Sequence, residues 1–246
     1  MIRRRIAELM DNPTLDHDEH RRALRTLNRL NRWLGTDKRL YHRLRPLLNR
    51  DRFSLLDLGS GGGSFLRYAA AQRELPARSQ LIGLDRSAYA LTAARNWPTA
   101  DPRSRRDSPI RLLWIAADAR HIPLPDESVD IVVCSLFLHH FSAADIVQIL
   151  SESARVARQG LVAGDLVRSP VAWCATWLTM RLVSRSHVCH VDGPRSVRSA
   201  LRPDELRDCA AHAGLTGASI ETHFPFRVTL AWCKKDGEHA ATGTRC

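Results

Sequence analysis

Hydrophobic and polar positions follow two different rhythms along this chain. Between Asp16 and Leu48, leucines recur every three or four residues among arginines and asparagines, which is the pattern of an amphipathic helix. Gly35 interrupts that pattern. From residue 53 onward, short apolar runs alternate with segments of helical period. We therefore expect residues 1–50 to form a helical extension of a larger domain that covers residues 51–235.

Five apolar runs predict the buried strands of this domain. They are residues 53–59, 80–87, 110–119, 129–136 and 160–167. Segments of helical period follow several of them, and strands that alternate with helices are typical of a parallel sheet with crossover helices. Two runs near the end, 218–224 and 227–235, predict an antiparallel pair. Residues 98–109 are polar and proline-rich and predict a loop, and residues 236–246 are expected to form a flexible tail.

Residues 168–200 break this alternation. The stretch VAWCATWLTMRLV, residues 171–183, predicts an apolar helix, and a turn rich in arginine and histidine is expected after it. In SHVCHVDG, His187, Cys189 and His190 lie close together in the sequence. Their spacing matches no known zinc motif and lacks a clear fourth ligand, so we expect no metal site.

The most informative stretch is SLLDLGSGGGSFLRYAA, residues 54–70, in which a glycine cluster lies between a strand and a helix. A flexible spacer does not fit between two such elements. A phosphate-binding loop of the GxxxxGK[ST] type needs a lysine that is absent here, and a GxGxxG dinucleotide motif needs glycine where Ser64 stands. Asp57, two residues before the first glycine, would repel a pyrophosphate, so a ligand with positive charge fits better.

The same stretch resembles motif I, D/E-x-G-x-G-x-G, of the class I S-adenosylmethionine-dependent methyltransferases. The resemblance extends over residues 53–165. It implies an α/β, Rossmann-like fold with a mostly parallel seven-stranded sheet, helices on both faces, an N-terminal helical extension and a helical lid inserted at 168–200. It also implies S-adenosylmethionine as the cofactor. The sulfonium and ammonium groups of this molecule carry positive charge, which is complementary to the carboxylate of Asp57.

The resemblance also implies a set of residues that bind the cofactor. Asp85 would accept hydrogen bonds from the ribose hydroxyls. Asp118 would interact with the adenine amino group, and Ala119 would contribute a backbone contact. Val129 replaces the aromatic residue usual at its position. The full expected set is Asp57, Gly59, Ser60, Gly61, Gly63, Asp85, Arg86, Asp118, Ala119, Ser135 and Leu136. For each acid taken alone, a helix cap or a surface carboxylate is the alternative role.

His139 and His140 follow the fourth predicted strand, where a parallel sheet forms its ligand crevice. Imidazole titrates near neutral pH, so either histidine is a candidate general base, and His140 is the stronger of the two. A role in capping the next helix or orienting its loop is the alternative. The sequence does not distinguish among O-, N- and C-methylation.

Two functions follow from this reading. The apolar lid favours methyl transfer to a small acceptor that is aromatic, quinone-like or polyketide-like, with O-methylation in a specialised-metabolism setting as the leading form. The net charge of +11, and 13 Lys or Arg against 6 Asp or Glu in residues 1–50, raise RNA methylation as the alternative. The chain lacks both an RNA-binding module and the Asn-Pro-Pro-aromatic tetrapeptide of base methylation, which argues against nucleic acid as a partner.

The remaining expectations concern the setting of the protein. The six cysteines show no CxxC spacing, which indicates reduced thiols and a cytoplasmic protein. No apolar run is long enough to span a bilayer, although the basic N-terminal segment is compatible with peripheral contact with an anionic membrane. The sequence does not indicate the oligomeric state.

Overall fold

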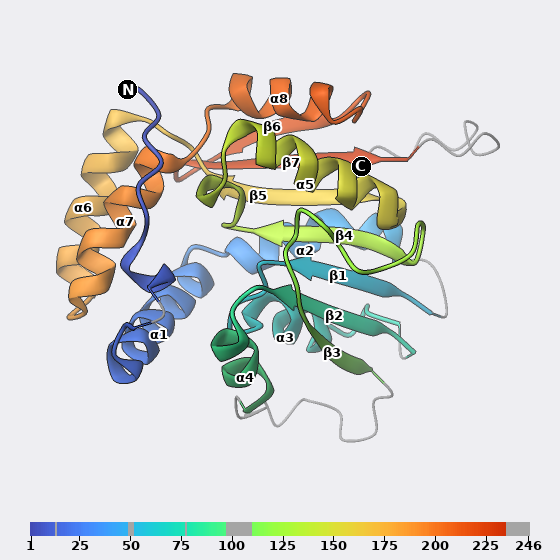
Figure 1. Cartoon of the computed structure of the whole chain (residues 1–246), viewed down its shortest axis with the longest axis horizontal. Coiled ribbons are helices and arrows are strands. Elements are labelled where there is room, and N and C mark those ends of the chain that lie inside the picture. The colour runs from blue at the N-terminus through green and yellow to red at the C-terminus, as the bar shows by residue number, and fades with distance from the viewer. Residues whose placement is uncertain (13, 49–51, 77, 97–109, 235–246) are drawn as a thin grey trace.

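A seven-stranded sheet forms the centre of the molecule (Figure 1). The computed structural model describes residues 1–12, 14–48, 52–76, 78–96 and 110–234. The strands are β1 (Ser54–Leu58), β2 (Gln80–Asp85), β3 (Arg111–Ala116), β4 (Val129–Ser135), β5 (Ala157–Leu166), β6 (Ser219–His223) and β7 (Arg227–Cys233). Their order is β3-β2-β1-β4-β5-β7-β6; β7 runs antiparallel to both of its neighbours, β5 and β6, and the other pairs are parallel. The expected parallel sheet and its closing antiparallel pair are confirmed.

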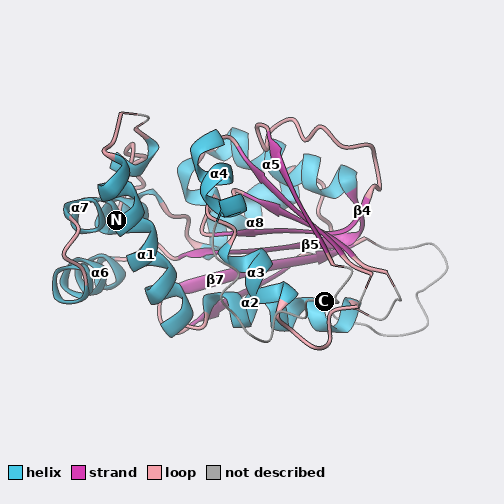
Figure 2. Ribbon diagram, turned by 90° about the horizontal axis from the view of Figure 1, so that it is seen from below, coloured by secondary structure: helices cyan, strands magenta, loops and turns pink. Residues whose placement is uncertain are grey.

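Helices cover both faces of the sheet (Figure 2). In the described residues they are α1 (His17–Trp33), α2 (Thr36–Leu44), α3 (Ser64–Ala70), α4 (Ala88–Asn96), α5 (Ala143–Val156), α6 (Pro170–Val183), α7 (His187–Ser199) and α8 (Pro203–His212). Short 3-10 helices lie at Leu9–Asp11, Arg45–Leu47 and Leu138–His140. Helices α2 and α3 pack on one face of the sheet, and α5 and α8 pack on the other.

The alternating direction of side chains along each strand produces one hydrophobic core on each face of the sheet. In β1, Leu55 belongs to the cluster under α2 and α3, whereas Leu56 belongs to the cluster under α5 and α8. Successive strand residues point to opposite faces, so a strand with helices on both sides is apolar throughout. The nearly continuous apolar runs of the sequence reflect this double burial.

Three helices form a separate group beyond the carboxyl ends of the parallel strands (Figure 1). Ala23 of α1, Met180 of α6, and Val188 and Cys189 of α7 are the buried members of its small core. Helices α6 and α7 approach closely at Gly193, where an added Cβ would lie 2.8 Å from Met180 Cγ. The group therefore stands over the edge of the sheet at which a parallel fold binds its ligands.

Some sequence-based expectations need correction or lie outside the described residues. The turn expected after residue 183 is limited to residues 184–186, and its extension over the histidine-rich residues is wrong, because His187–Ser199 is helical despite the internal Pro194. Gly35 does end α1, adopting the left-handed conformation between α1 and α2. Cys134, Cys174, Cys189 and Cys209 are free as expected, but Cys233 is disulfide-bonded. The predicted tail at 236–246 and most of the predicted loop at 98–109 lie outside the described residues.

Candidate active site

The glycine-rich segment forms a tight loop between β1 and α3. Gly59, Gly61 and Gly63 all have positive φ, at +65°, +49° and +72°, a region that other residues rarely adopt. The Phe137 ring lies against Gly59, and an added Cβ there would be 2.1 Å from a ring carbon. Glycine is therefore required at position 59 by both the backbone conformation and the close approach of Phe137.

Asp85, at the end of β2, holds this loop in place. Its Oδ2 accepts a hydrogen bond from the Gly61 N–H at 2.8 Å, and its Oδ1 accepts one from the Ser87 N–H at 2.8 Å. Each carboxylate oxygen has two lone pairs, so both can accept a further hydrogen bond. Asp85 lines a cavity of about 710 Å³, and a diol placed there would find an acceptor.

Asp57 lies on the other side of the loop and lines a second cavity, of about 440 Å³. Burial raises the pKa of Asp57 well above its ordinary value, and the charges of Asp37 and Asp85 add to the effect. Asp37, from α2, lines the same cavity. A cation bound there would relieve the cost of the buried carboxylate. Ser60 Oγ, on the wall of the cavity, is buried without a hydrogen-bond partner in the described residues.

Asp118 is engaged by a neighbouring arginine. Arg120 donates to both oxygens of Asp118, from Nη2 to Oδ2 at 2.7 Å and from Nε to Oδ1 at 3.1 Å, and lowers the pKa of Asp118 to about 2. Arg120 also pairs with Asp145 at 3.1 Å. Asp118 therefore stays ionised. Together with Arg86 and the buried Ala119, it lines the same cavity as Asp85.

The two cavities share a wall at the end of β4. Leu136, which has a positive φ of 53°, and Gly59 line both of them, and Ser135 lines the smaller one. The Leu136 N–H donates to Gly164 O at 2.7 Å, which fixes the strand end. His140 also lines both cavities. The glycine loop, the end of β4 and His140 therefore lie together at the wall between the two cavities.

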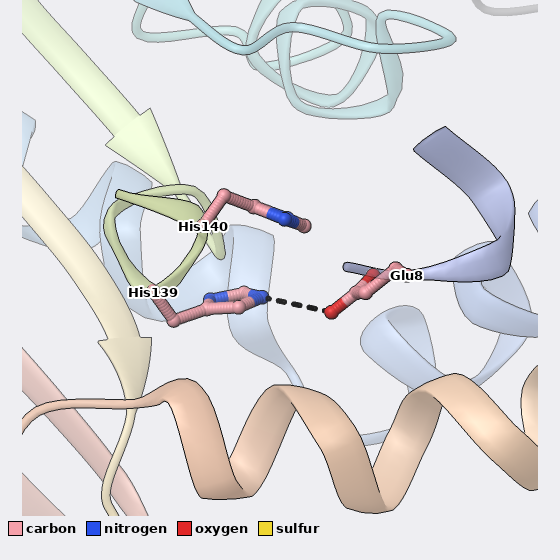
Figure 3. Close-up of side chains that lie close together, drawn as sticks. All are labelled: Glu8, His139 and His140. Carbon is pink, nitrogen blue, oxygen red and sulfur yellow. Dashed lines mark ion pairs between the residues drawn. The ribbon is translucent and has the colours of Figure 1, made fainter. Parts of the chain in front are cut away.

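His139 is a buried cation held between the carboxylates of Asp165 and Glu8, of which Figure 3 shows Glu8. Its Nδ1 lies 2.7 Å from Asp165 Oδ1, and its Nε2 lies 3.6 Å from Glu8 Oε1. Burial alone would lower the pKa of His139, but the charges and hydrogen bonds of Asp165 and Glu8 outweigh it and raise that pKa to about 10. His139 is therefore protonated at neutral pH and has no free lone pair with which to act as a base.

His140 has the opposite character although its ring centroid is only 4.2 Å from that of His139. Burial lowers the pKa of His140, and the positive charge of His139 lowers it further. Its Nδ1 lies 3.8 Å from Asp11 Oδ2. His140 is therefore neutral at physiological pH, and a proton on Nδ1 facing Asp11 leaves Nε2 with a lone pair.

Glu8 and Asp11 reach the site from the N-terminal segment, which crosses the face of α7 (Figure 1). Asp192 of α7 anchors this segment by accepting hydrogen bonds from the backbone N–H groups of Leu9 and Met10, at 2.8 and 3.0 Å. Sequence reasoning missed Glu8, Asp11, Asp37 and Asp192, since no local motif links residues so distant in the chain. It could have found Asp165, which ends a predicted strand as Asp57 and Asp85 do.

Glu8, His139 and His140 each offer one possible ligand atom, all within 4.8 Å of one another. A metal ion requires neutral imidazole nitrogens. In the described residues both ring nitrogens of His139 face carboxylates, Asp165 at 2.7 Å and Glu8 at 3.6 Å, and a protonated imidazole has no lone pair to offer a metal.

Comparison with known proteins agrees with this geometry. Residues 56–163 match the family model described as a methyltransferase domain. The chain is 35% identical over 187 residues to the malonyl-[acyl-carrier protein] O-methyltransferase of Yersinia pestis, a match that covers 72% of this chain and 58% of that protein. Residues 56–163 therefore belong to the methyltransferase-domain family, in agreement with the resemblance to class I S-adenosylmethionine-dependent methyltransferases. The chain spans a little over half the length of this curated relative.

Solved structures show that this methyltransferase has the fold of its class. The plantazolicin methyltransferase BpumL, crystallised with a monoazolic desmethylPZN analog and SAH, superposes with a TM-score of 0.65 at 15% identity, over 93% of this chain and 94% of that one. Magnesium protoporphyrin IX methyltransferase from Synechocystis PCC 6803, with bound SAH, gives a TM-score of 0.54 at 14% identity, over 92% and 91%. The expected Rossmann-like architecture is confirmed.

The two cavities fit the cofactor of this class. In the larger cavity, the two carboxylate oxygens of Asp85 can accept hydrogen bonds. In the smaller cavity, the buried carboxylate of Asp57 would be stabilised by a bound cation. S-adenosylmethionine carries a ribose diol in its nucleoside part and cationic sulfonium and ammonium groups in its methionine part. The chemistry of the donor set therefore matches the chemistry of the ligand in both cavities.

Proposed function

We propose that this methyltransferase transfers the methyl group of S-adenosylmethionine to a hydroxyl oxygen of a small, apolar acceptor that is aromatic, quinone-like or polyketide-like. The observation that carries the proposal is the position and charge state of His140. It is a neutral imidazole at the junction of the two cavities, beside a histidine that is already protonated.

The larger cavity and the loop beside it would hold the nucleoside. Asp85 would bind the ribose and Asp118 and Ala119 would lie around the adenine. Asp57, with Ser60 and the loop glycines, would face the cationic end. When bound, S-adenosylmethionine supplies an electrophilic methyl group on a sulfonium that is already a good leaving group.

The acceptor would share the smaller cavity with the cationic end of the cofactor, which Asp57 would face. The wall of this cavity is largely apolar and is built by α1, α6 and α7 together with the sheet edge; the apolar lining includes Leu24, Leu27, Leu30, Leu34, Phe65, Val167, Met180, Val197 and Phe226. Asn28, Asn31, Thr176 and Thr179 add a few polar groups that can orient a ligand. A volume of about 440 Å³ suits a small molecule and offers no basic channel for a nucleic acid.

In this mechanism the chain aligns the acceptor, excludes water and moves one proton. His140 Nε2 would accept the proton that the hydroxyl group of the acceptor loses on methylation. His139 stays protonated throughout, held by Asp165 and Glu8, and its charge keeps His140 neutral and ready to accept. The N-terminal segment brings Glu8 and Asp11 to the pair, and α6 serves as part of a lid.

The test supplies the purified protein with S-adenosylmethionine carrying a labelled methyl group, together with either total RNA or an extract of apolar aromatic compounds. We expect label in the extract as a methyl ether, and much less with His140→Gln. Label in RNA would support the alternative of RNA methylation, and label on nitrogen or carbon would refute O-methylation.

A further inference from the structure

Helix α6 carries its larger apolar side chains on the face directed away from the protein. Val171, Trp177, Leu178, Leu182 and Val183 are exposed, at 66, 39, 52, 76 and 54%. The opposite face carries Met180 together with smaller or more polar residues: Ala172, Ala175, Thr176 and Thr179. An ordinary surface helix is polar outside and apolar inside, and α6 reverses that order.

The orientation of α6 is fixed by its neighbours. Gly193 of α7 lets Met180 and Thr176 approach so closely that an added Cβ would clash with Met180. Ala172 and Met180 are almost fully buried. A rotation that turned Leu178 and Leu182 inward would break this packing, so the outward apolar face is a consequence of the fold.

Exposed apolar residues also lie at the rim of the acceptor cavity. Trp33, at the end of α1, is 81% exposed and lines the cavity, and Phe224, 85% exposed, directly precedes two of its lining residues. Exposed apolar residues on α6 and beside the cavity together mark a candidate interaction surface. Its position beside the cavity mouth links the surface to the entry of the acceptor.

The charge around this face indicates the partner. Arg181 lies over the Trp177 ring with its guanidinium carbon 4.1 Å from the ring centroid, and Arg185 is exposed at the end of the helix. Within the described part of the chain, neither arginine forms an ion pair with a carboxylate. Tryptophan and arginine beside exposed leucines are typical of helices that lie in the headgroup region of an anionic membrane.

No helix among the described residues has both the length and the apolar character needed to cross a bilayer, so the contact would lie in the plane of the surface. We propose that α6 docks this methyltransferase on an anionic phospholipid bilayer, with the mouth of the acceptor cavity at the interface. The inference deepens the proposed function, because an apolar acceptor would then enter from the lipid. The docking itself can be measured without an acceptor.

The test is co-sedimentation of the full chain with vesicles of phosphatidylcholine alone or of phosphatidylcholine with an equal part of phosphatidylglycerol. We expect binding to the anionic vesicles that weakens as salt is raised. Leu178→Glu with Leu182→Glu should reduce the partition coefficient about tenfold or more, and Arg181→Gln with Arg185→Gln should reduce it roughly tenfold.

Leu113→Glu is the matched control, because Leu113 is 42% exposed on the edge strand β3 and lines neither cavity (Figure 1). It should bind vesicles as the unmodified chain does. S-adenosylhomocysteine binding checks that each variant is folded, and Leu178→Ser with Leu182→Ser replaces the glutamate variant if that one fails to fold. The proposal is overturned by absence of vesicle binding, by equal binding of the α6 variants, or by an α6-dependent dimer in solution that does not bind lipid. Methyl transfer without vesicle binding would overturn this inference alone.

Discussion

His139 and Asp165 form a buried ion pair at the carboxyl end of the sheet, with His139 Nδ1 2.7 Å from Asp165 Oδ1. Asp165 also accepts a hydrogen bond from the His139 backbone N–H at 2.9 Å, so one carboxylate fixes both the ring and the main chain. The positive charge of His139, which Asp165 stabilises, lowers the pKa of the neighbouring His140. Two adjacent histidines therefore differ in protonation state.

Removal of Asp165 should therefore destabilise the fold. The change Asp165→Asn leaves His139 without its closest counter-charge in a buried position, and loss of one partner of a buried pair costs about 3–5 kcal/mol. Urea unfolding followed by circular dichroism would measure this loss in the free energy of unfolding. The control is Asp204→Asn, because Asp204 forms an exposed pair with Arg202, and its loss should matter far less. Equal losses of stability in the two variants would contradict a charged, buried pair of His139 and Asp165.

The pH dependence of stability should carry the signature of His139. Its pKa is raised in the folded state from 6.5 to about 10, so its contribution is fully present below pH 6.5 and is lost as the pH rises through about 10. The pKa values of Asp165 and Glu8 are lowered, so their contributions are lost as the pH falls instead. The melting temperature of His139→Gln, compared with the unmodified protein, should differ most just below pH 6.5 and converge toward about pH 10. A constant difference across that range would contradict a charged His139.

The pH dependence of activity should report on His140. Its pKa is lowered from 6.5, so the rate should fall only when the pH drops below that ordinary value. The change His140→Gln should reduce kcat by about 10²- to 10⁴-fold while S-adenosylhomocysteine affinity is kept. His212→Gln, at an exposed histidine on α8, is the matched control and should leave both quantities unchanged. A His140→Gln enzyme with normal turnover would rule out the proposed base.

Cofactor binding should depend on Asp85 more than on Asp118. Because Asp85 also holds the Gly61 N–H, Asp85→Asn retains one acceptor oxygen and tests the charge, whereas Asp85→Ala removes the interaction entirely. A hydrogen bond to a charged group contributes about 1.5–3 kcal/mol, so Asp85→Ala should weaken S-adenosylhomocysteine binding at least tenfold by calorimetry. Unchanged affinity would contradict its expected role, and binding of NAD in place of S-adenosylhomocysteine would contradict the cofactor.

Removal of metal ions should leave activity unchanged. The ligand atoms of Glu8, His139 and His140 are close enough for a metal, but a protonated His139 cannot coordinate one. Dialysis against a chelator should therefore have no effect on the rate of methyl transfer. Loss of activity that returns with one divalent cation would show that His139 is neutral and a ligand in the working enzyme.

Local patterns predicted the strands, the glycine loop and the placement of Asp57 and Asp85 at the sheet edge. These features depend on alternation and on motif spacing within a few residues. The helix at His187–Ser199 was missed because Gly193 and Pro194 are helix breakers in isolation, and only the close contact with α6 explains the glycine. The charge states of His139 and His140 could not be predicted, since Glu8 lies more than a hundred residues away in the chain.

The most direct measurement of the central claim is mass spectrometry of apolar aromatic compounds incubated with the protein and S-adenosylmethionine that carries a trideuteromethyl group. The account predicts a product with one trideuteromethyl ether, and almost none with the His140→Gln variant. Label recovered in RNA instead, or equal yields from the two proteins, would contradict it.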